Sequence, residues 1–164
     1  MRRSDREVTD IGRINEIIKE AGVLRLAMND EAYPYIVPMH YGYEFKNGKL
    51  IFWLHGAKEG KKLDLLKKDP RVCVELDCNM DIISGGDDAC AYGAAYSSVI
   101  AFGTAEVTEE PSAKIHGLKL LMKEQTGKEF EISEKMASGI AVIRVVCDSF
   151  TAKERPVPDI GRRQ

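Results

Sequence analysis

Apolar residues recur every three to four positions in three stretches of the chain, which is the spacing of an amphipathic helix. The first stretch covers 10–21, with Asp10 as its N-cap and Gly22 as its stop. The second ends at Asp69-Pro70, because a proline disfavours helical backbone in the residue before it. The third opens at Glu110-Pro111. Its spacing predicts a buried stripe made of Ile115, Leu118, Leu121 and Met122.

Between and after these helices the chain has the pattern of six strands. Lys46-Asn47-Gly48 indicates a tight hairpin turn, because an Asn-Gly pair tolerates the positive φ values that such turns need. Pro38 has no N–H for a strand ladder and indicates an edge, a bulge or a bend, and Gly103 indicates a bulge or a barrel bend. The predicted strands are 23–28, 35–45, 50–55, 72–76, 96–107 and 140–146.

The remaining segments show neither pattern. Residues 77–95, which include the run from Ser84 to Asp88, are expected to form a long loop, and 1–9 and 154–164 are expected to be loose tails. The whole chain, 1–164, is then one domain. Six strands with helices at the start, after the third strand and before the last one favour a closed antiparallel β-barrel, because closure removes exposed strand edges.

Composition and charge exclude several classes of protein. Apolar residues make up 44% of the chain and charged residues 30%, an ordinary balance for a globular domain. The net charge of −2 offers no basic field for nucleic acid. Because no apolar run approaches the roughly 20 residues of a membrane span and the start of the chain is polar, we expect a cytoplasmic protein without a membrane partner. Four scattered cysteines fit free thiols in a reducing compartment.

The most informative stretch for chemistry runs from His55 to Lys62, from the end of a strand into the start of a helix. Helix starts offer unpaired N–H groups and the positive end of the helix dipole, which suit a phosphate. Glycines there let the backbone approach a ligand closely, and lysines add charge. The stretch therefore predicts a phosphate site, although the lysines fit a solvated helix face equally well. The residues concerned are Gly56, Lys58, Gly60, Lys61 and Lys62.

Two other kinds of site find no support in the sequence. Cys73 and Cys78 are five positions apart, and the chain has no Cys-x-x-Cys or His-x-x-x-His pair, so no structural zinc is expected. Ser97 and Ser98 lack the Gly-x-Ser-x-Gly elbow of a nucleophilic serine. The sequence therefore predicts neither a metal site nor a catalytic triad.

Five runs of residues form a larger pattern through their order and spacing: Pro34–Met39, Leu54–Leu66, Asp69–Val72, Tyr96–Ala105 and Thr151–Lys153. Together they resemble the pyridoxamine 5′-phosphate oxidase-like flavoproteins, and within that family the nitroimidazole-resistance branch. The likeness covers roughly residues 8–153.

This resemblance implies a six-stranded antiparallel split β-barrel, an obligate homodimer and FMN bound at the subunit interface. It implies that Lys61 and Lys62 hold the flavin phosphate, and that His55 and Gly56 lie along the ribityl chain and the ring. The strands supply the other implied contacts, with Val37, Pro38, Met39 and His40 at the isoalloxazine edge, and Ser98 with Val99 from the fifth strand.

The same resemblance implies an FMN-dependent oxidoreductase that passes electrons from a reduced donor, such as a pyridine nucleotide, to a small acceptor such as a nitroaromatic. His55 is then a candidate catalytic residue, and simple contact with the ligand is the alternative. Pyridoxamine phosphate oxidases usually show Ser-Arg-Lys where this chain has Gly60-Lys61-Lys62, and no counterpart of their C-terminal aromatic and arginine is found, so that activity is not expected. A non-catalytic flavin- or haem-binding protein on the same barrel and an apo scaffold remain open alternatives.

Overall fold

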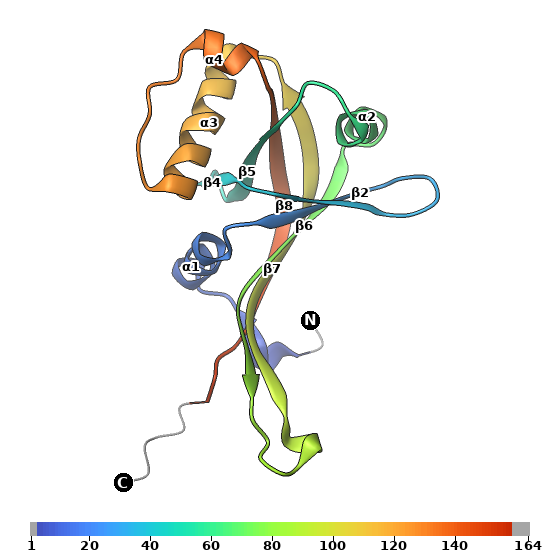
Figure 1. Ribbon diagram of the computed structural model, residues 1–164, viewed down its shortest axis with the longest axis vertical. Helices are drawn as coiled ribbons and strands as arrows, with labels where there is room; N and C mark the ends of the chain where they lie inside the picture. Colours follow the sequence, from blue (N-terminus) through green and yellow to red (C-terminus); the bar gives the residue numbers. More distant parts are fainter. Residues whose placement is uncertain (1–2, 159–164) are drawn as a thin grey trace.

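The computed structural model describes residues 3–158 as one strongly curled antiparallel sheet with helices packed around it (Figure 1). The sheet order is β3-β2-β6-β7-β8-β5-β4, and the short β1 pairs with β8. The helices are α1 (Ile11–Ala21), α2 (Lys61–Lys68), α3 (Pro111–Thr126) and α4 (Glu134–Ser138), with the short turns η1 (Ser4–Arg6) and η2 (Ala89–Ala91). The strands are β1 (Glu7–Val8), β2 (Leu24–Met28), β3 (Tyr35–Met39), β4 (Gly42–Lys46), β5 (Lys49–Gly56), β6 (Arg71–Ile83), β7 (Gly93–Thr108) and β8 (Ala141–Arg155).

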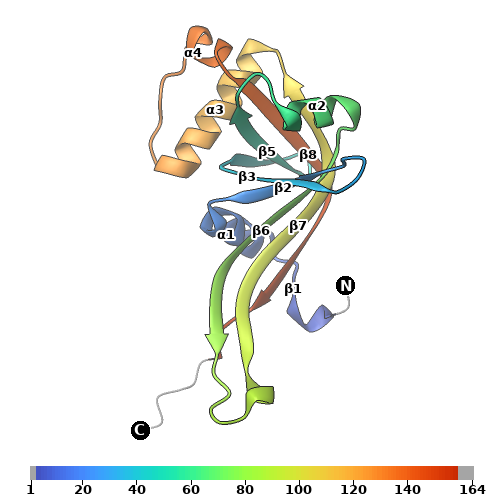
Figure 2. The same cartoon turned by 45° about the vertical axis from the view of Figure 1, so that its right-hand side comes forward.

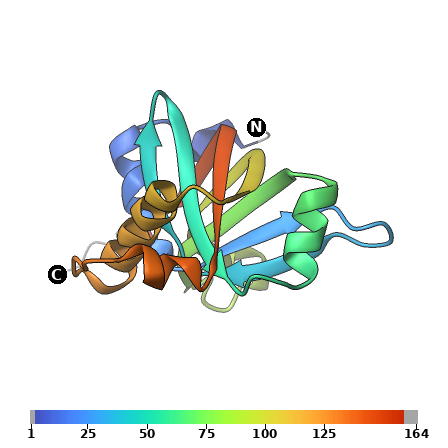
Figure 3. The same ribbon diagram turned by 90° about the horizontal axis from the view of Figure 1, so that it is seen from above.

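Figure 3 shows how the strands curl around one another. The inner side of the curled sheet carries a single main core, because alternate residues of each strand point to that side. The inward rows of β2, β6 and β7 are apolar, as Leu26, Val74 and Ala101 illustrate, and all three are buried. Ile17 and Ile18 of α1 are fully buried in the same core. A second, smaller cluster lies under α3, where Leu118 packs with Trp53 of β5. The buried stripe predicted for α3 is partly wrong, since Ile115 and Met122 are only half-buried and their places are taken by Lys114 and Gly117.

The prediction of a closed barrel with six strands is wrong. Within the described residues there are eight strands, and the two ends of the sheet, β3 and β4, do not pair with each other. The single strand expected over 35–45 is interrupted at His40 and Tyr41, which carry the chain directly from one edge of the sheet to the other. Pro38 lies in β3, which pairs only with β2, and this edge position is one where a missing N–H is tolerated.

The segment 77–95 is mostly strand and not a long loop. β6 continues to Ile83 and β7 begins at Gly93, so that only 84–92 connect them in a hairpin that extends away from the helices (Figures 1 and 2). The strand alternation is interrupted at Asn79, which has a positive φ of 57°, and the register of the pair shifts between Cys78 and Asp81. Beyond this shift Met80 and Ile82 are exposed, so that the apolar pattern no longer marks a buried face.

The end of the sheet also departs from the expected boundaries. β8 extends to Arg155, well past 146, and Glu7 and Val8 of the expected N-terminal tail pair with it opposite Lys153 and Ala152. The bulge expected at Gly103 is confirmed, because the register between β7 and β8 shifts at that residue. The remaining ends of both expected tails, 1–2 and 159–164, lie outside the described residues. Among the described helices, none has the length and apolar character needed to cross a membrane.

Opposite the core, strands β3, β2, β6, β7 and β8 present a continuous surface that no other described element covers, here called the outer face. Large apolar side chains on it are exposed, with Ile36 at 57%, Ile100 at 40% and Phe102 at 55% of their full accessibility. Between them Arg25 forms ion pairs with Glu75, at 3.2 Å, and with Asp77. Two rows of directly paired residues define the face: Pro38, Arg25, Glu75, Ile100 and Thr151, and Ile36, Ala27, Cys73, Phe102 and Ser149.

Gly42 provides the first test of this fold. A Cβ atom added there would lie 2.3 Å from the backbone nitrogen of Leu121 in α3, a contact that backbone cannot relieve by rotation. We expect Gly42→Ala to lower the free energy of unfolding by about 2 kcal/mol, the usual cost of overpacking a filled site. Urea denaturation measures the change. The control is Gly139→Ala, where the nearest atom lies at 3.8 Å and little effect is expected, and equal stability of the two variants would contradict the close packing of β4 on α3.

Candidate functional site

The strand β5 ends at Gly56, and four residues later the helix α2 begins after Gly60. Gly60 has a φ of 125°, a conformation that side-chain-bearing residues rarely adopt, and its side chain provides no cap. The first N–H groups of α2 are therefore left for solvent or a ligand, as expected for an anion site at a helix start. This is the stretch in which the sequence predicts the phosphate site.

Lys62 lies over Gly56. A Cβ atom added at Gly56 would be only 2.5 Å from the Nζ of Lys62, so the absence of a side chain at Gly56 gives the ammonium group its place. Lys62 is half-buried, and it makes no ion pair or side-chain hydrogen bond to any residue of 3–158. The result is a positive charge held beside bare backbone with its hydrogen-bonding capacity unused.

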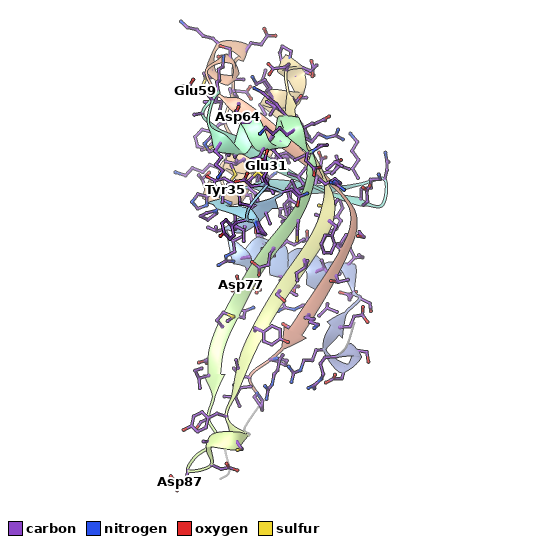
Figure 4. The ribbon with its side chains drawn as sticks, turned by 90° about the vertical axis from the view of Figure 1, so that its right-hand side faces the viewer. Glu31, Tyr35, Glu59, Asp64, Asp77 and Asp87 are labelled. Carbon is purple, nitrogen blue, oxygen red and sulfur yellow. The ribbon has the colours of Figure 1, made fainter. Side chains whose placement is uncertain are left out.

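Lys61 is in a different situation from its neighbour. Its Nζ lies 2.7 Å from Oδ2 of Asp30 and 4.7 Å from the centre of the Tyr35 ring. The hydrogen bond from Lys61 holds the pKa of the Asp30 carboxyl below its ordinary value. Figure 4 shows Tyr35 and Glu31 beside α2. Lys61 therefore ties α2 to the β2–β3 loop, and its positive charge is already compensated.

His55, the candidate catalytic residue, is the next-to-last residue of β5 and is exposed. Partial burial lowers its pKa from the ordinary value, and the positive charge of Lys62 and the nearby His40 lower it further. The imidazole is therefore neutral at pH 7, with one ring nitrogen as donor and the other as acceptor. His40 is exposed, and its Nδ1 lies 3.2 Å from the backbone oxygen of Gly22 at the end of α1.

The side chain of His55 borders a shallow apolar hollow of about 260 Å³ between β5, α3 and α4. Its lining is almost wholly apolar, with Leu118, Met122, Phe130 and Met136 among the residues that form it. A flexible Met pair and an aromatic ring can adapt to flat apolar ligands of different shape.

The other residues that the resemblance implies as flavin contacts lie on two different sides of the sheet. Val37 is half-buried and packs against the core, and Met39 and Val99 belong to it, so only their backbone groups are open to a ligand outside the barrel. Pro38, exposed, lies on the outer face. Ser98 points to the outer side of β7, where it lines a shallow hollow of about 210 Å³ with Ile100, Thr151 and Lys153.

The structure brings together Gly56, Gly60, Lys62 and His55, with His40 close enough to affect the pKa of His55. It does not bring Ser98 to them, because Ser98 pairs with Lys153, twelve residues along β8 from Ala141, and Ala141 is the residue that pairs with Gly56. Lys58 also lies apart, on the wall of a separate hollow. Asp30 and Tyr35 belong to the site through Lys61, and nothing in the sequence marked them, since they contact α2 only after the β2–β3 loop folds back.

Within residues 3–158 no group of three or more His, Cys, Asp or Glu side chains is placed to hold a metal ion. The four cysteines are free, and burial raises the pKa of Cys78 to about 11 and that of Cys147 to about 12. The thiols of Cys78 and Cys147 are therefore protonated at pH 7 and poor nucleophiles.

Comparison with known proteins identifies the family. A family model described as pyridoxamine 5′-phosphate oxidase matches residues 10–154. The chain belongs to the pyridoxamine 5′-phosphate oxidase family. No curated protein matches it in sequence.

Solved structures share the fold across nearly the whole chain. A candidate 5-nitroimidazole antibiotic resistance protein from Bacteroides thetaiotaomicron is 28% identical, with 90% of this chain and 85% of that chain covered and a TM-score of 0.76. A flavocytochrome from Azotobacter vinelandii is 16% identical, with coverages of 96% and 73% and a TM-score of 0.76. An FAD- and haem-binding protein from Mycobacterium smegmatis is 18% identical, with coverages of 95% and 77% and a TM-score of 0.76. The last two likenesses show the fold alone.

The contact between Lys62 and the His55 region can be tested by titration. Removal of the positive charge in Lys62→Met should raise the pKa of His55, whereas Lys61→Met should leave it unchanged because Lys61 is engaged by Asp30. NMR of the imidazole C–H signals resolves the site, since the chain has only three histidines. An equal response of His55 to both variants would show that Lys62 does not lie beside it.

The lowered pKa of His55 also determines how this residue makes the stability of the fold depend on pH. Because the pKa of His55 is lower in the folded protein than in the unfolded chain, the unfolded chain binds more protons as the pH falls. This contribution to stability is present above the ordinary histidine pKa and is lost as the pH falls through the folded value. His55→Asn should therefore reduce the loss of stability on acidification.

Proposed function

We propose that this protein is an FMN-binding oxidoreductase of the nitroimidazole-reductase type. The observation that carries the proposal is the half-buried, uncompensated ammonium of Lys62 over the bare backbone of Gly56, beside the open N-terminus of α2. A dianionic phosphate satisfies all three groups at once, because it accepts hydrogen bonds from the ammonium and from backbone N–H groups. Family membership and the likeness to the candidate nitroimidazole resistance protein support the choice of a flavin phosphate.

The residues present fit an FMN molecule with its phosphate at this cradle. Lys62 would hold the phosphate directly, and Lys61, held by Asp30 and Tyr35, would fix the position of α2. When bound, the flavin supplies the electron transfer between donor and acceptor. Backbone groups of β3, from Val37 to Met39, would lie along the isoalloxazine edge.

The acceptor is proposed to be a small nitroaromatic that enters beside His55. Reduction of a nitro group to a nitroso group consumes two electrons and two protons and releases water, so a hydrogen-bond donor near the nitro oxygens favours the reaction. Neutral His55 provides such a donor, and the apolar hollow with Met122 and Met136 provides a surface for the flat ring. A reduced pyridine nucleotide is the proposed donor of the electrons.

A homodimer is the proposed functional unit. The outer face exposes Ile36, Ile100 and Phe102 together, and such a contiguous apolar surface is typical of an interface. Ser98 lies far along the sheet from Gly56, the residue beneath Lys62, so the contact between Ser98 and the flavin is proposed to come from Ser98 of the partner subunit.

A second candidate is a non-catalytic flavin- or haem-binding protein. It is favoured by two proteins of the same fold, one described as a flavocytochrome and the other as binding FAD and haem. The absorption spectrum of the purified protein, before and after addition of FMN, distinguishes these possibilities. A two-banded flavin spectrum with turnover of a nucleotide and a nitroaromatic supports the oxidoreductase, a Soret band supports haem, and no uptake of FMN overturns the proposal.

The phosphate assignment predicts a difference between two flavins. Lys62→Met should weaken FMN binding by about 10- to 100-fold, the usual effect of losing a charge-assisted hydrogen bond, and should leave riboflavin binding unchanged because riboflavin has no phosphate. Quenching of flavin fluorescence measures both affinities. The control is Lys68→Met at the other end of α2, which should bind FMN normally. An equal loss for both flavins would place the phosphate elsewhere.

The dimer predicts a change in mass. Phe102→Asp puts a charge in the centre of the outer face and should convert the dimer to a monomer, as measured by light scattering after size exclusion. Phe130→Asp is the control, because Phe130 is similarly exposed, at 41%, but lies away from the outer face. A monomeric wild-type protein, or a dimer that survives Phe102→Asp, would contradict this assignment.

A further inference from the structure

Another hollow, larger than those at His55 and Ser98, opens at the end of the sheet where α2 and α3 lie. It is formed by α2, the end of β7, the start of α3 and the start of β8, elements that lie together at one end of the molecule in Figures 1 and 2. Its volume is about 680 Å³, within the range of small-molecule sites. Apolar side chains, Leu63, Leu66 and Val107 among them, form much of its wall.

Lys114 of α3 lines this hollow and is only 7% exposed. Lysine is almost never buried to this extent without a partner, because removing an ammonium from water costs several kcal/mol unless another group replaces the lost hydration. Yet its ammonium makes no hydrogen bond and no ion pair to any residue within 3–158. No buried side-chain N or O atom in that range lacks both a partner and solvent contact, so the Nζ of Lys114 must reach the water of the hollow.

The carboxylates near Lys114 are engaged elsewhere or lie at the wall. Glu110, one helical turn earlier, accepts hydrogen bonds from the backbone N–H groups of Ser112, at 3.0 Å, and Ala113, at 2.6 Å, as the cap of α3. Glu106 accepts a hydrogen bond from Arg144 at 3.1 Å. Neither Glu110 nor Glu106 therefore pairs with the ammonium of Lys114.

The charge of the lining sets the kind of ligand. Lys58 and Lys67 are exposed, so water screens their charges, and Glu106 is paired with Arg144. Lys114 is the buried cation of the lining. A single negative charge balances Lys114, whereas a dianion such as phosphate would bring a second charge against the apolar wall. A hydrocarbon chain attached to the charged group would be stabilised by burial against the apolar wall.

We propose that this hollow binds a small amphiphilic monoanion, a carboxylate with a short hydrocarbon chain, whose head group pairs with Lys114. The site is separate from the flavin cradle, since neither Lys62 nor His55 lines it, but it lies next to it, because Ala141 on its wall pairs directly with Gly56. Lys58, expected among the flavin contacts, belongs to this hollow in the structure.

Hexanoate tests the proposal, with uncharged hexan-1-ol and inorganic phosphate as comparison probes. Calorimetric titration of the full chain, both as purified and saturated with FMN, should show hexanoate binding at least tenfold tighter than either comparison probe. Lys114→Met should weaken hexanoate binding at least tenfold and leave hexan-1-ol binding unchanged, and Lys114→Arg should retain the preference for hexanoate. Lys128→Met, on an exposed lysine after the same helix, is the matched control and should bind hexanoate normally.

The melting temperature of the Lys114→Met variant provides a second test. If Lys114 serves a ligand, Lys114→Met should melt at the same temperature as the ligand-free wild type or higher, because the ammonium makes no hydrogen bond or ion pair that holds the described fold together. A large fall in its melting temperature would assign Lys114 to the fold instead. Equal affinities for hexanoate and hexan-1-ol would show that the charge of the ligand does not contribute to binding. Displacement of hexanoate by FMN would show that the hollow is part of the flavin site. Any of these three results overturns the proposal, and the first two can be measured whether or not FMN proves to be the cofactor.

Discussion

The fold depends on how two residues, His40 and Tyr41, carry the chain between the two free edges of the sheet. Tyr41 is fully buried and its hydroxyl donates a hydrogen bond to the backbone oxygen of Ile18 in α1. The amide nitrogen of Gln125 in α3 donates to the backbone oxygen of Tyr41 at 2.8 Å. Contacts with α1 and α3 thus fix the short segment that connects β3 to β4. These contacts take the place of the hydrogen bonds that close a true barrel.

The position of this crossing also determines where chemistry can take place. It turns β3 away from β4, which places His40 near His55 while the outward residues of β3 stay on the uncovered face of the sheet. An edge strand with exposed backbone is normally a risk, because it can pair with other chains. In β3 the exposed edge contains Pro38, which cannot donate a ladder hydrogen bond, so a stretch of open backbone can serve a ligand without recruiting another strand.

The parts of the fold that were predictable from sequence are those governed by local periodicity. α1, α2 and the start of α3 follow from caps, stops and apolar spacing, and the turn at Asn47-Gly48 follows from its backbone preference, confirmed by the positive φ of both residues. The division of 35–45 was not predictable, because the apolar alternation runs on unbroken while the reason for the break, the burial of Tyr41 against α1, is a long-range contact. The same holds for the hairpin beyond Asn79, whose exposed apolar residues show no pattern of burial within one chain.

For the candidate site, the stretch from His55 to Lys62 could be located from the sequence. Which of its lysines is available to a ligand could not be predicted from the sequence. Three neighbouring cations have three different environments: Lys58 faces the large hollow, Lys61 pairs with Asp30, and Lys62 lies over Gly56. These differences arise from contacts with residues that are distant in the sequence, such as Asp30, and the spacing of residues within the stretch carries no information about such contacts. The resemblance to a family suggested a flavin phosphate as the ligand, and the tertiary contacts leave Lys62 as the lysine of this stretch that lies over Gly56 without an ion pair in the described residues.

One packing detail gives the protein an internal optical reporter. The chain has a single tryptophan, Trp53, whose indole nitrogen donates to Glu44 at 3.0 Å and whose ring fills the place where Gly117 of α3 has no side chain. The ring of His116 meets it edge-on at 5.5 Å. Intrinsic fluorescence therefore follows the docking of α3 onto the sheet, and it does so without a label and at a position remote from the tip of the β6–β7 hairpin, where Asp87 lies (Figure 4).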